Sequence, residues 1–136
     1  MNDDCLFCKI VNGDIASEKV YEDDTIFAFM DMKPVSRGHV LVVPKKHSND
    51  LLSTDDEVLE KFLPSVKKLA GIIVKAVNAV GINISSNNGA AAGQSVFHLH
   101  FHLIPRFGND NLPAWPHHLT EHKTRAEVAE LIRKNL

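Results

Sequence analysis

The chain has 136 residues, of which 44% are hydrophobic and 24% are charged, and its net charge is −2 with neutral histidines. These values fit one soluble globular domain that can bury a core without disulfides. They also exclude the positively charged surface that a nucleic-acid backbone requires, and the most apolar stretch, residues 70–84, is too short to cross a bilayer.

The N-terminus, Met1 to Asp4, is acidic, whereas a secretory signal begins with basic residues and continues into an apolar segment. We therefore expect a cytoplasmic protein with no membrane segment and no nucleic-acid partner. The two cysteines, Cys5 and Cys8, are too few for a disulfide framework.

The first half of the chain is predicted to form one short helix and three strands. A helix is expected over residues 6–12, ended by Gly13. Strands are expected at residues 19–21, 25–31 and 39–44. The last of these is almost entirely apolar in its middle, which predicts burial on both faces.

One long helix is expected next, because apolar residues recur at helical spacing over residues 58–80. Thr54 and Glu57 fit a capping box at its start, and Gly81 fits a stop at its end. Pro64 lies inside the pattern and predicts a kink or an irregular first section.

Two further strands, at residues 82–86 and 96–104, are expected to flank the loop 87–95, and a last helix is expected at 124–135. Five strands with one long helix and short terminal helices predict an α+β fold with a mostly antiparallel sheet. We expect a single domain over residues 1–136.

Three histidines alternate with apolar residues in the run His98-Leu99-His100-Phe101-His102-Leu103. In a strand, the histidines would share one face at intervals of about 6.6 Å, and the apolar residues would enter the core. A polar strand face that happens to hold histidines is the structural alternative. Three imidazoles in a row are costly in a dry core but reasonable around a bound anion or a metal, which favours a functional site.

This run resembles the His-x-His-x-His-x-x motif of the histidine triad superfamily. The preceding Gly93-Gln94-Ser95-Val96-Phe97 is similar to the corresponding segment of the Hint branch. Residues 5–10, the region of Asp31 and residues 38–47 also match, in order. The resemblance covers about residues 5–106 and implies the HIT-like fold, with residues 107–136 shaping the substrate pocket and the rim of a homodimer.

The resemblance assigns catalytic roles to four residues. His100 would attack the α-phosphorus of a purine nucleotide and form a nucleotidyl-histidine intermediate that water hydrolyses. His102 would hydrogen-bond the phosphoryl oxygens. Gln94 and Ser95 would contact the bridging or leaving atom, with Ser95 donating a proton to an amine leaving group.

Binding roles are implied for eight more residues. Asn87, Gly93 and His39 would surround the phosphate, and the Asp31 carboxylate would accept hydrogen bonds from both ribose hydroxyls. Phe7, Ile10, Phe29 and Met32 would enclose the purine; without the resemblance they would be assigned to the core.

Cys5 and Cys8 form a Cys-x-x-Cys pair, which alone is a weak metal signal near a chain end. Bacterial members of the superfamily that carry this pair use it with two histidines, here His47 and His98, to bind zinc. A Cys₂His₂ set suits a closed, structural zinc site, and reduced thiols without metal are the alternative. No organic cofactor is expected.

The implied activity is hydrolysis of purine nucleoside phosphoramidates or related nucleotidyl substrates, releasing a nucleoside monophosphate such as AMP. Pro105-Arg106 stands where many Hint proteins have Gly-Gly and is similar to the dinucleoside-polyphosphate branch. A dinucleoside polyphosphate hydrolase is therefore one alternative. A non-catalytic nucleotide-binding interaction module is the other.

Overall fold

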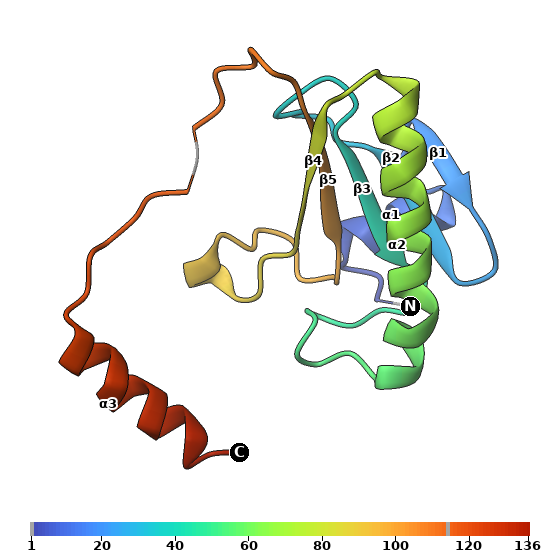
Figure 1. Cartoon of the computed structure of the whole chain (residues 1–136). Helices are drawn as coiled ribbons and strands as arrows, with labels where there is room; N and C mark the ends of the chain where they lie inside the picture. The colour runs from blue at the N-terminus through green and yellow to red at the C-terminus, as the bar shows by residue number, and fades with distance from the viewer. Residues whose placement is uncertain (1, 114) are drawn as a thin grey trace.

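A five-stranded sheet with helices on its two faces positions most of the residues singled out in the sequence (Figure 1). The structure is a computed structural model that describes residues 2–113 and 115–136. The elements in chain order are α1 (Leu6–Asn12), β1 (Lys19–Glu22), β2 (Ile26–Met30), β3 (Val40–Pro44), α2 (Asp56–Ala76), β4 (Gly81–Ser85), the 3₁₀ turn η1 (Ala90–Ala92), β5 (Phe101–Arg106) and α3 (His122–Arg133).

The strands lie in the order β1-β2-β3-β5-β4, and every neighbouring pair is antiparallel. This confirms the predicted α+β class and the antiparallel sheet. All five residues of β3 are buried, as its apolar sequence predicted, because β3 is central and both faces of the sheet are covered. β1 and β4 are the edge strands.

Alternation along the strands divides the core in two. Val42 and Leu103 face α2 and pack with Phe62 in a cluster that forms the larger core. Leu41 and Val43 face the opposite side and pack in a second cluster with residues of α1. The histidine run therefore lies between two packed layers.

The predicted start and end of the long helix were wrong in detail. Asp55 is the N-cap of α2 and makes no side-chain capping bond, while the Thr54 hydroxyl donates to the Asp50 carbonyl oxygen at 2.6 Å. The helix is continuous through Pro64 and ends at Ala76. Asn78 takes a left-handed conformation with φ 56°, so the chain leaves the helix before Gly81, which opens β4.

The strand predicted over residues 96–104 begins only at Phe101. Its first residues make other bonds: the Leu99 N–H donates to the Ser48 carbonyl at 2.8 Å, and the Gln94 amide donates to the Val96 carbonyl at 3.1 Å. His98 and His100 therefore lie on a segment held by loops and side chains, and only His102 belongs to the ladder.

Beyond β5 the chain runs away from the sheet and ends in α3, which stands apart from it (Figure 1). α3 begins two residues earlier than predicted, and none of its residues is buried. Within the described ranges, no helix combines the length and apolar character needed to cross a membrane.

Candidate metal centre and histidine site

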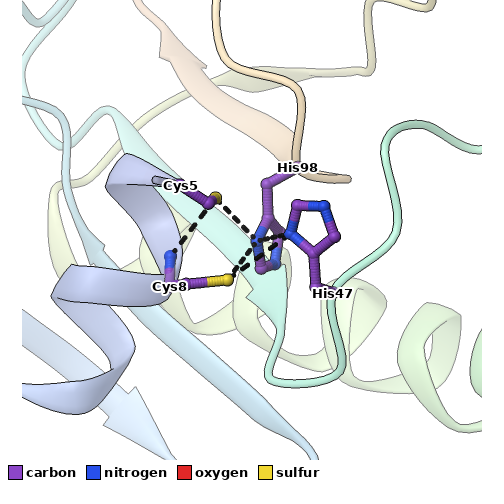
Figure 2. Close-up of side chains that lie close together, drawn as sticks. All are labelled: Cys5, Cys8, His47 and His98. Carbon is purple, nitrogen blue, oxygen red and sulfur yellow. Dashed lines mark hydrogen bonds between the residues drawn. The ribbon is translucent and has the colours of Figure 1, made fainter. Parts of the chain in front are cut away.

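Four side chains from three separate segments meet beside α1 (Figure 2). Cys5 and Cys8 lie at the start of α1, His47 follows β3, and His98 precedes β5. Their donor atoms all lie within 4.8 Å of one another. Cys5 Sγ and Cys8 Sγ lie 3.4 and 3.5 Å from His98 Nδ1. His47 Nδ1 lies 3.2 Å from His98 Nδ1 and 3.4 Å from Cys8 Sγ. This arrangement can hold a metal ion.

A backbone carbonyl fixes the protonation of His98. Its Nε2 lies 2.8 Å from the carbonyl oxygen of Pro44, which can only accept, so Nε2 carries the proton and Nδ1 keeps a lone pair. Burial lowers the pKa of His98 to about 4, which keeps the ring neutral. Burial also raises the pKa of the Cys8 thiol, so a thiolate there requires a compensating cation.

A backbone carbonyl also fixes the protonation of His100, but here the protonated nitrogen is Nδ1 rather than Nε2. Its Nδ1–H donates to the carbonyl oxygen of His98 at 2.7 Å, which leaves the lone pair on Nε2. The ring is 5% exposed and packs edge-on against Phe7, with ring centroids 5.0 Å apart. Burial lowers the pKa of His100, so the imidazole is neutral near pH 7.

His39 and His102 form a second cluster with Asp31. The backbone N–H of Val35 donates to His39 Nδ1 at 3.0 Å, so the proton of neutral His39 is on Nε2. This Nε2 lies 2.9 Å from His102 Nδ1 and 3.5 Å from Asp31 Oδ2. His102 therefore accepts at Nδ1 and has a donor at Nε2. Burial, with smaller contributions from His100 and His39, lowers the pKa of His102 to about 4.

Most residues predicted to bind the nucleoside gather in the core layer beside α1. Phe7, Ile10 and Phe29 are buried in one cluster, and the rings of Phe7 and Phe29 are 5.5 Å apart. Asp31 follows β2 and its side chain is 18% exposed. Met32 is 88% exposed and does not join this cluster.

The loop before the triad holds the remaining predicted residues. The Gln94 side chain is 5% exposed: its amide nitrogen donates to the Asn49 carbonyl at 2.6 Å and its oxygen accepts from Gly89 N–H at 2.8 Å. This side chain braces the loop. The Asn87 amide donates to the Gly93 carbonyl at 3.4 Å, and Gly93 has φ 89°, a conformation that favours glycine. Ser95 is exposed.

Three backbone groups of the site were not predicted from the sequence. The carbonyls of Pro44 and His98 and the N–H of Val35 set the tautomers of three histidines. These are backbone groups, so no pattern of side-chain types could reveal them. Ser36 was also missed; its hydroxyl donates to the Pro105 carbonyl at 2.6 Å and ties the segment between β2 and β3 to β5.

This chain is similar to several known proteins, two of which have a named activity. A Borreliella burgdorferi protein named as an uncharacterized HIT-like protein is 51% identical over 79% of this chain and 78% of its own length. Adenylylsulfatase HINT3 of Arabidopsis thaliana is 38% identical over 100% of this chain and 71% of its own. Adenosine 5′-monophosphoramidase HNT1 of Candida albicans is 36% identical over 97% of this chain and 91% of its own.

Solved structures agree. A Streptococcus mutans protein superposes with a TM-score of 0.92 and 42% identity, covering 99% of this chain and 87% of that one. A HIT-family protein of Bacillus subtilis superposes with a TM-score of 0.88 and 39% sequence identity, covering 98% of each chain. The sequence profile described as the HIT domain matches residues 12–109. This chain belongs to the HIT domain family.

Proposed function

We propose that this protein hydrolyses purine nucleoside phosphoramidates, or related nucleotidyl substrates, at the α-phosphate and releases a nucleoside monophosphate such as AMP. The observation that carries the proposal is the free lone pair on His100 Nε2, held by the 2.7 Å bond from Nδ1 to the His98 carbonyl. The family includes relatives named as hydrolases of adenylyl compounds, which supports nucleotide hydrolysis at the family level.

His100 acts as the nucleophile in this proposal. Its Nε2 lone pair forms a bond to the α-phosphorus while the bond from phosphorus to the leaving amine breaks, and the leaving nitrogen takes that electron pair. The Ser95 hydroxyl donates a proton to the leaving amine. Water then attacks the phosphorus and gives a proton to the Ser95 oxygen, while the bond from phosphorus to His100 breaks and its electron pair returns to Nε2, which restores the neutral imidazole and the serine hydroxyl.

His102 and His39 stabilise the phosphoryl group. Because His39 Nε2–H donates to His102 Nδ1, the Nε2–H of His102 is available to a phosphoryl oxygen. The phosphate is further bounded by Asn87 and Gly93. Gln94 contributes by holding the loop, since both ends of its amide are already bonded to backbone.

The nucleoside lies against the apolar cluster of α1 and β2. Asp31 accepts hydrogen bonds from the two ribose hydroxyls, with Phe7, Ile10 and Phe29 on the side of the base. Met32, exposed in the free protein, covers the base from the open side. Its high exposure leaves room for that movement.

Zinc fits the cluster of Cys5, Cys8, His47 and His98. Tetrahedral zinc, with bonds of about 2.3 Å to sulfur and about 2.0 Å to nitrogen, places its ligand atoms roughly 3.3–3.8 Å apart. Four of the six pairs of donor atoms are 3.2–3.5 Å apart here, and all four atoms lie within 4.8 Å of one another. Four protein ligands would leave no open position on the ion, so zinc would supply stability and hold His98 in place. We also propose that the protein is a homodimer.

Turnover measurements on an adenosine phosphoramidate, adenylyl sulfate and a diadenosine polyphosphate test the proposal. We expect the phosphoramidate to have the highest kcat/KM, and rapid acid quenching to trap nucleotide on His100. Absence of turnover on all three, with intact nucleotide binding, would instead favour a binding module.

Arg106 gives no support to the polyphosphate alternative, because its guanidinium bonds Asp110 and Asn83.

A further inference from the structure

The loop that joins β3 to α2, residues 47–54, holds a peptide group between two histidines of the triad run. The Ser48 carbonyl accepts from the Leu99 N–H at 2.8 Å. This N–H and the His98 carbonyl belong to the same planar peptide group, and that carbonyl accepts from His100 Nδ1 at 2.7 Å. A rotation of the peptide that breaks the first bond therefore also moves the oxygen that fixes the proton of His100.

The same loop is tied to the segment that precedes the triad. The Asn49 carbonyl accepts from the Gln94 amide at 2.6 Å, and the Leu51 N–H donates to Asn88 Oδ1 at 2.8 Å. Packing contributes less, because the loop and the start of α2 line a cavity of about 270 Å³ and the side chain of Leu52 is 85% exposed. Polar bonds therefore keep this loop in place.

One buried hydroxyl connects the two ends of the loop. Thr54 is 8% exposed, and its hydroxyl donates to the Asp50 carbonyl at 2.6 Å. A hydroxyl has a single proton and a carbonyl can only accept, so the proton of Thr54 is already used. The Ser48 hydroxyl, whose oxygen lies 2.6 Å from Thr54 Oγ1, must therefore be the donor in that pair. The result is a directed chain of hydrogen bonds from Ser48 through Thr54 to the backbone of Asp50.

We propose that Thr54 is a positioning residue for the reaction. Its hydroxyl fixes Ser48, and the Ser48 carbonyl orients the peptide group whose oxygen holds the Nδ1 proton of His100. Thr54 thereby helps to direct the Nε2 lone pair of His100 at the phosphorus, and it acts through Ser48 rather than on the substrate. This inference rests on the proposed role of His100 as the nucleophile, whereas the chain of hydrogen bonds can be tested without any substrate.

Amide exchange and ¹⁵N NMR of the full chain test the hydrogen bonds without measuring activity. Thr54→Val removes the hydroxyl and keeps the shape of the side chain. We expect the Leu99 amide to exchange about tenfold faster and the Nδ1–H tautomer of His100 to lose population, while the amides of β3 keep their protection. Ser48→Ala breaks the same chain at its other end and takes the place of Thr54→Val if that variant does not fold. Normal exchange at Leu99 with an unchanged tautomer of His100 would overturn the proposal.

Steady-state kinetics on the adenosine phosphoramidate connect the chain of hydrogen bonds to catalysis. We expect Thr54→Val to lower kcat by about tenfold and to change KM by less than about twofold, because the proposed contacts to base and ribose lie outside this loop. Ser48→Ala should lower kcat as much, and the double variant should lower it no further, since both substitutions break one chain. Thr54→Ser restores the hydroxyl and should recover most of kcat.

The control is Ser53→Ala, because the neighbouring Ser53 is exposed and its hydroxyl bonds Asp50 within its own turn. This variant should match the wild type. An equal loss of kcat in Ser53→Ala, or a change confined to KM in Thr54→Val, would overturn the positioning role. Wild-type protein without turnover would instead refute the proposed function, whereas normal wild-type turnover with an unaffected Thr54→Val would refute only the role of Thr54.

Discussion

Two histidine clusters lie on either side of His100, and their key histidines turn different nitrogens inward: His98 and His39 both carry the proton on Nε2, but His98 presents Nδ1 to its cluster and His39 presents Nε2. In the first, His98 donates to the Pro44 carbonyl through Nε2 and turns its unprotonated Nδ1 toward two cysteines and His47. In the second, His39 receives the Val35 N–H at Nδ1 and must present a proton at Nε2. The first cluster can therefore hold a cation, whereas the second can pass hydrogen bonds from one side chain to the next.

Distance alone does not separate them. Asp31, His39 and His102 also have donor atoms within 4.8 Å of one another, as a metal site would. A metal at His39 Nε2 would require moving its proton to Nδ1, where it would oppose the Val35 N–H at 3.0 Å. The backbone N–H of Val35 thus favours a chain of hydrogen bonds over a metal ion at this second cluster.

The two clusters meet at one residue. The side chain of His98 belongs to the metal cluster, and its carbonyl accepts from His100 Nδ1 at 2.7 Å. Because the strand ladder begins only at Phe101, this bond and the metal ligands hold the backbone on which His100 sits. A metal ion bound to the first cluster would therefore help to hold the proposed nucleophile without touching substrate.

Removing the proposed nucleophile should have the largest effect. His100→Ala is expected to lower kcat by about 10⁴-fold or more, because bond formation to phosphorus depends on one nitrogen. Nucleotide affinity should change by less than about tenfold, since binding is shared with Asp31 and the apolar cluster. The exposed His118 supplies the control, His118→Ala, which should match the wild type. A His100→Ala protein with near-normal turnover would refute the mechanism.

Loss of the metal cluster should act mainly on stability. Cys5 is the N-cap of α1, and Ser is a good N-cap, so Cys5→Ser removes the thiolate while keeping the cap. We expect a loss of about 3 kcal/mol or more in the free energy of unfolding, with a smaller change in kcat. The control is the same comparison after a chelator has removed the metal: without metal, wild-type protein and Cys5→Ser should have nearly the same free energy of unfolding.

Elemental analysis sharpens the contrast between the clusters. We expect one zinc per chain in the wild type and none in Cys5→Ser. Two metals per chain would show that Asp31, His39 and His102 also bind an ion, and the tautomer argument would fail. One metal that persists in Cys5→Ser would place the ion outside the proposed cluster.

The sequence was informative where side-chain identity and period decide the outcome. The almost continuous apolar run predicted the buried β3, and the family resemblance predicted a cluster of two cysteines and two histidines whose four members do converge. The resemblance contributed His47, which lies 39 residues from Cys8 and which no local spacing could connect to it.

The remaining errors have a common physical origin in backbone bonding. Residues 96–100 have the composition of a strand, yet their backbone groups bond to Ser48, Gln94 and His100. Thr54 could have capped α2, but its hydroxyl bonds Asp50. In each case a partner distant in sequence, or a competing local bond, overrides a favourable pattern.

Ribose recognition by Asp31 should have a moderate effect. Asp31→Ala is expected to weaken nucleoside binding by about 1–3 kcal/mol through loss of charge-assisted hydrogen bonds. Asp31 Oδ1 also accepts from the Lys33 N–H at 2.7 Å, so Asp31→Asn is the better-matched variant because it can keep that turn. Calorimetry with a 2′,3′-dideoxy analogue should show a much smaller loss. An equal loss of affinity with the analogue would show that Asp31 does not recognise the ribose hydroxyls.

The pH dependence of the rate should be the smallest effect. An imidazole must be neutral to attack phosphorus, and burial lowers the pKa of His100 from the usual 6.5. A lowered pKa moves the acid limb of kcat/KM to lower pH, so activity is retained at 6.5 and falls only below it. An ordinary histidine would already have lost half of its activity at that pH. Circular dichroism and metal content at each pH separate titration from unfolding and from metal loss. With both constant, a limb centred at or above 6.5 would mean that His100 is hydrated and that the packing against Phe7 opens in solution.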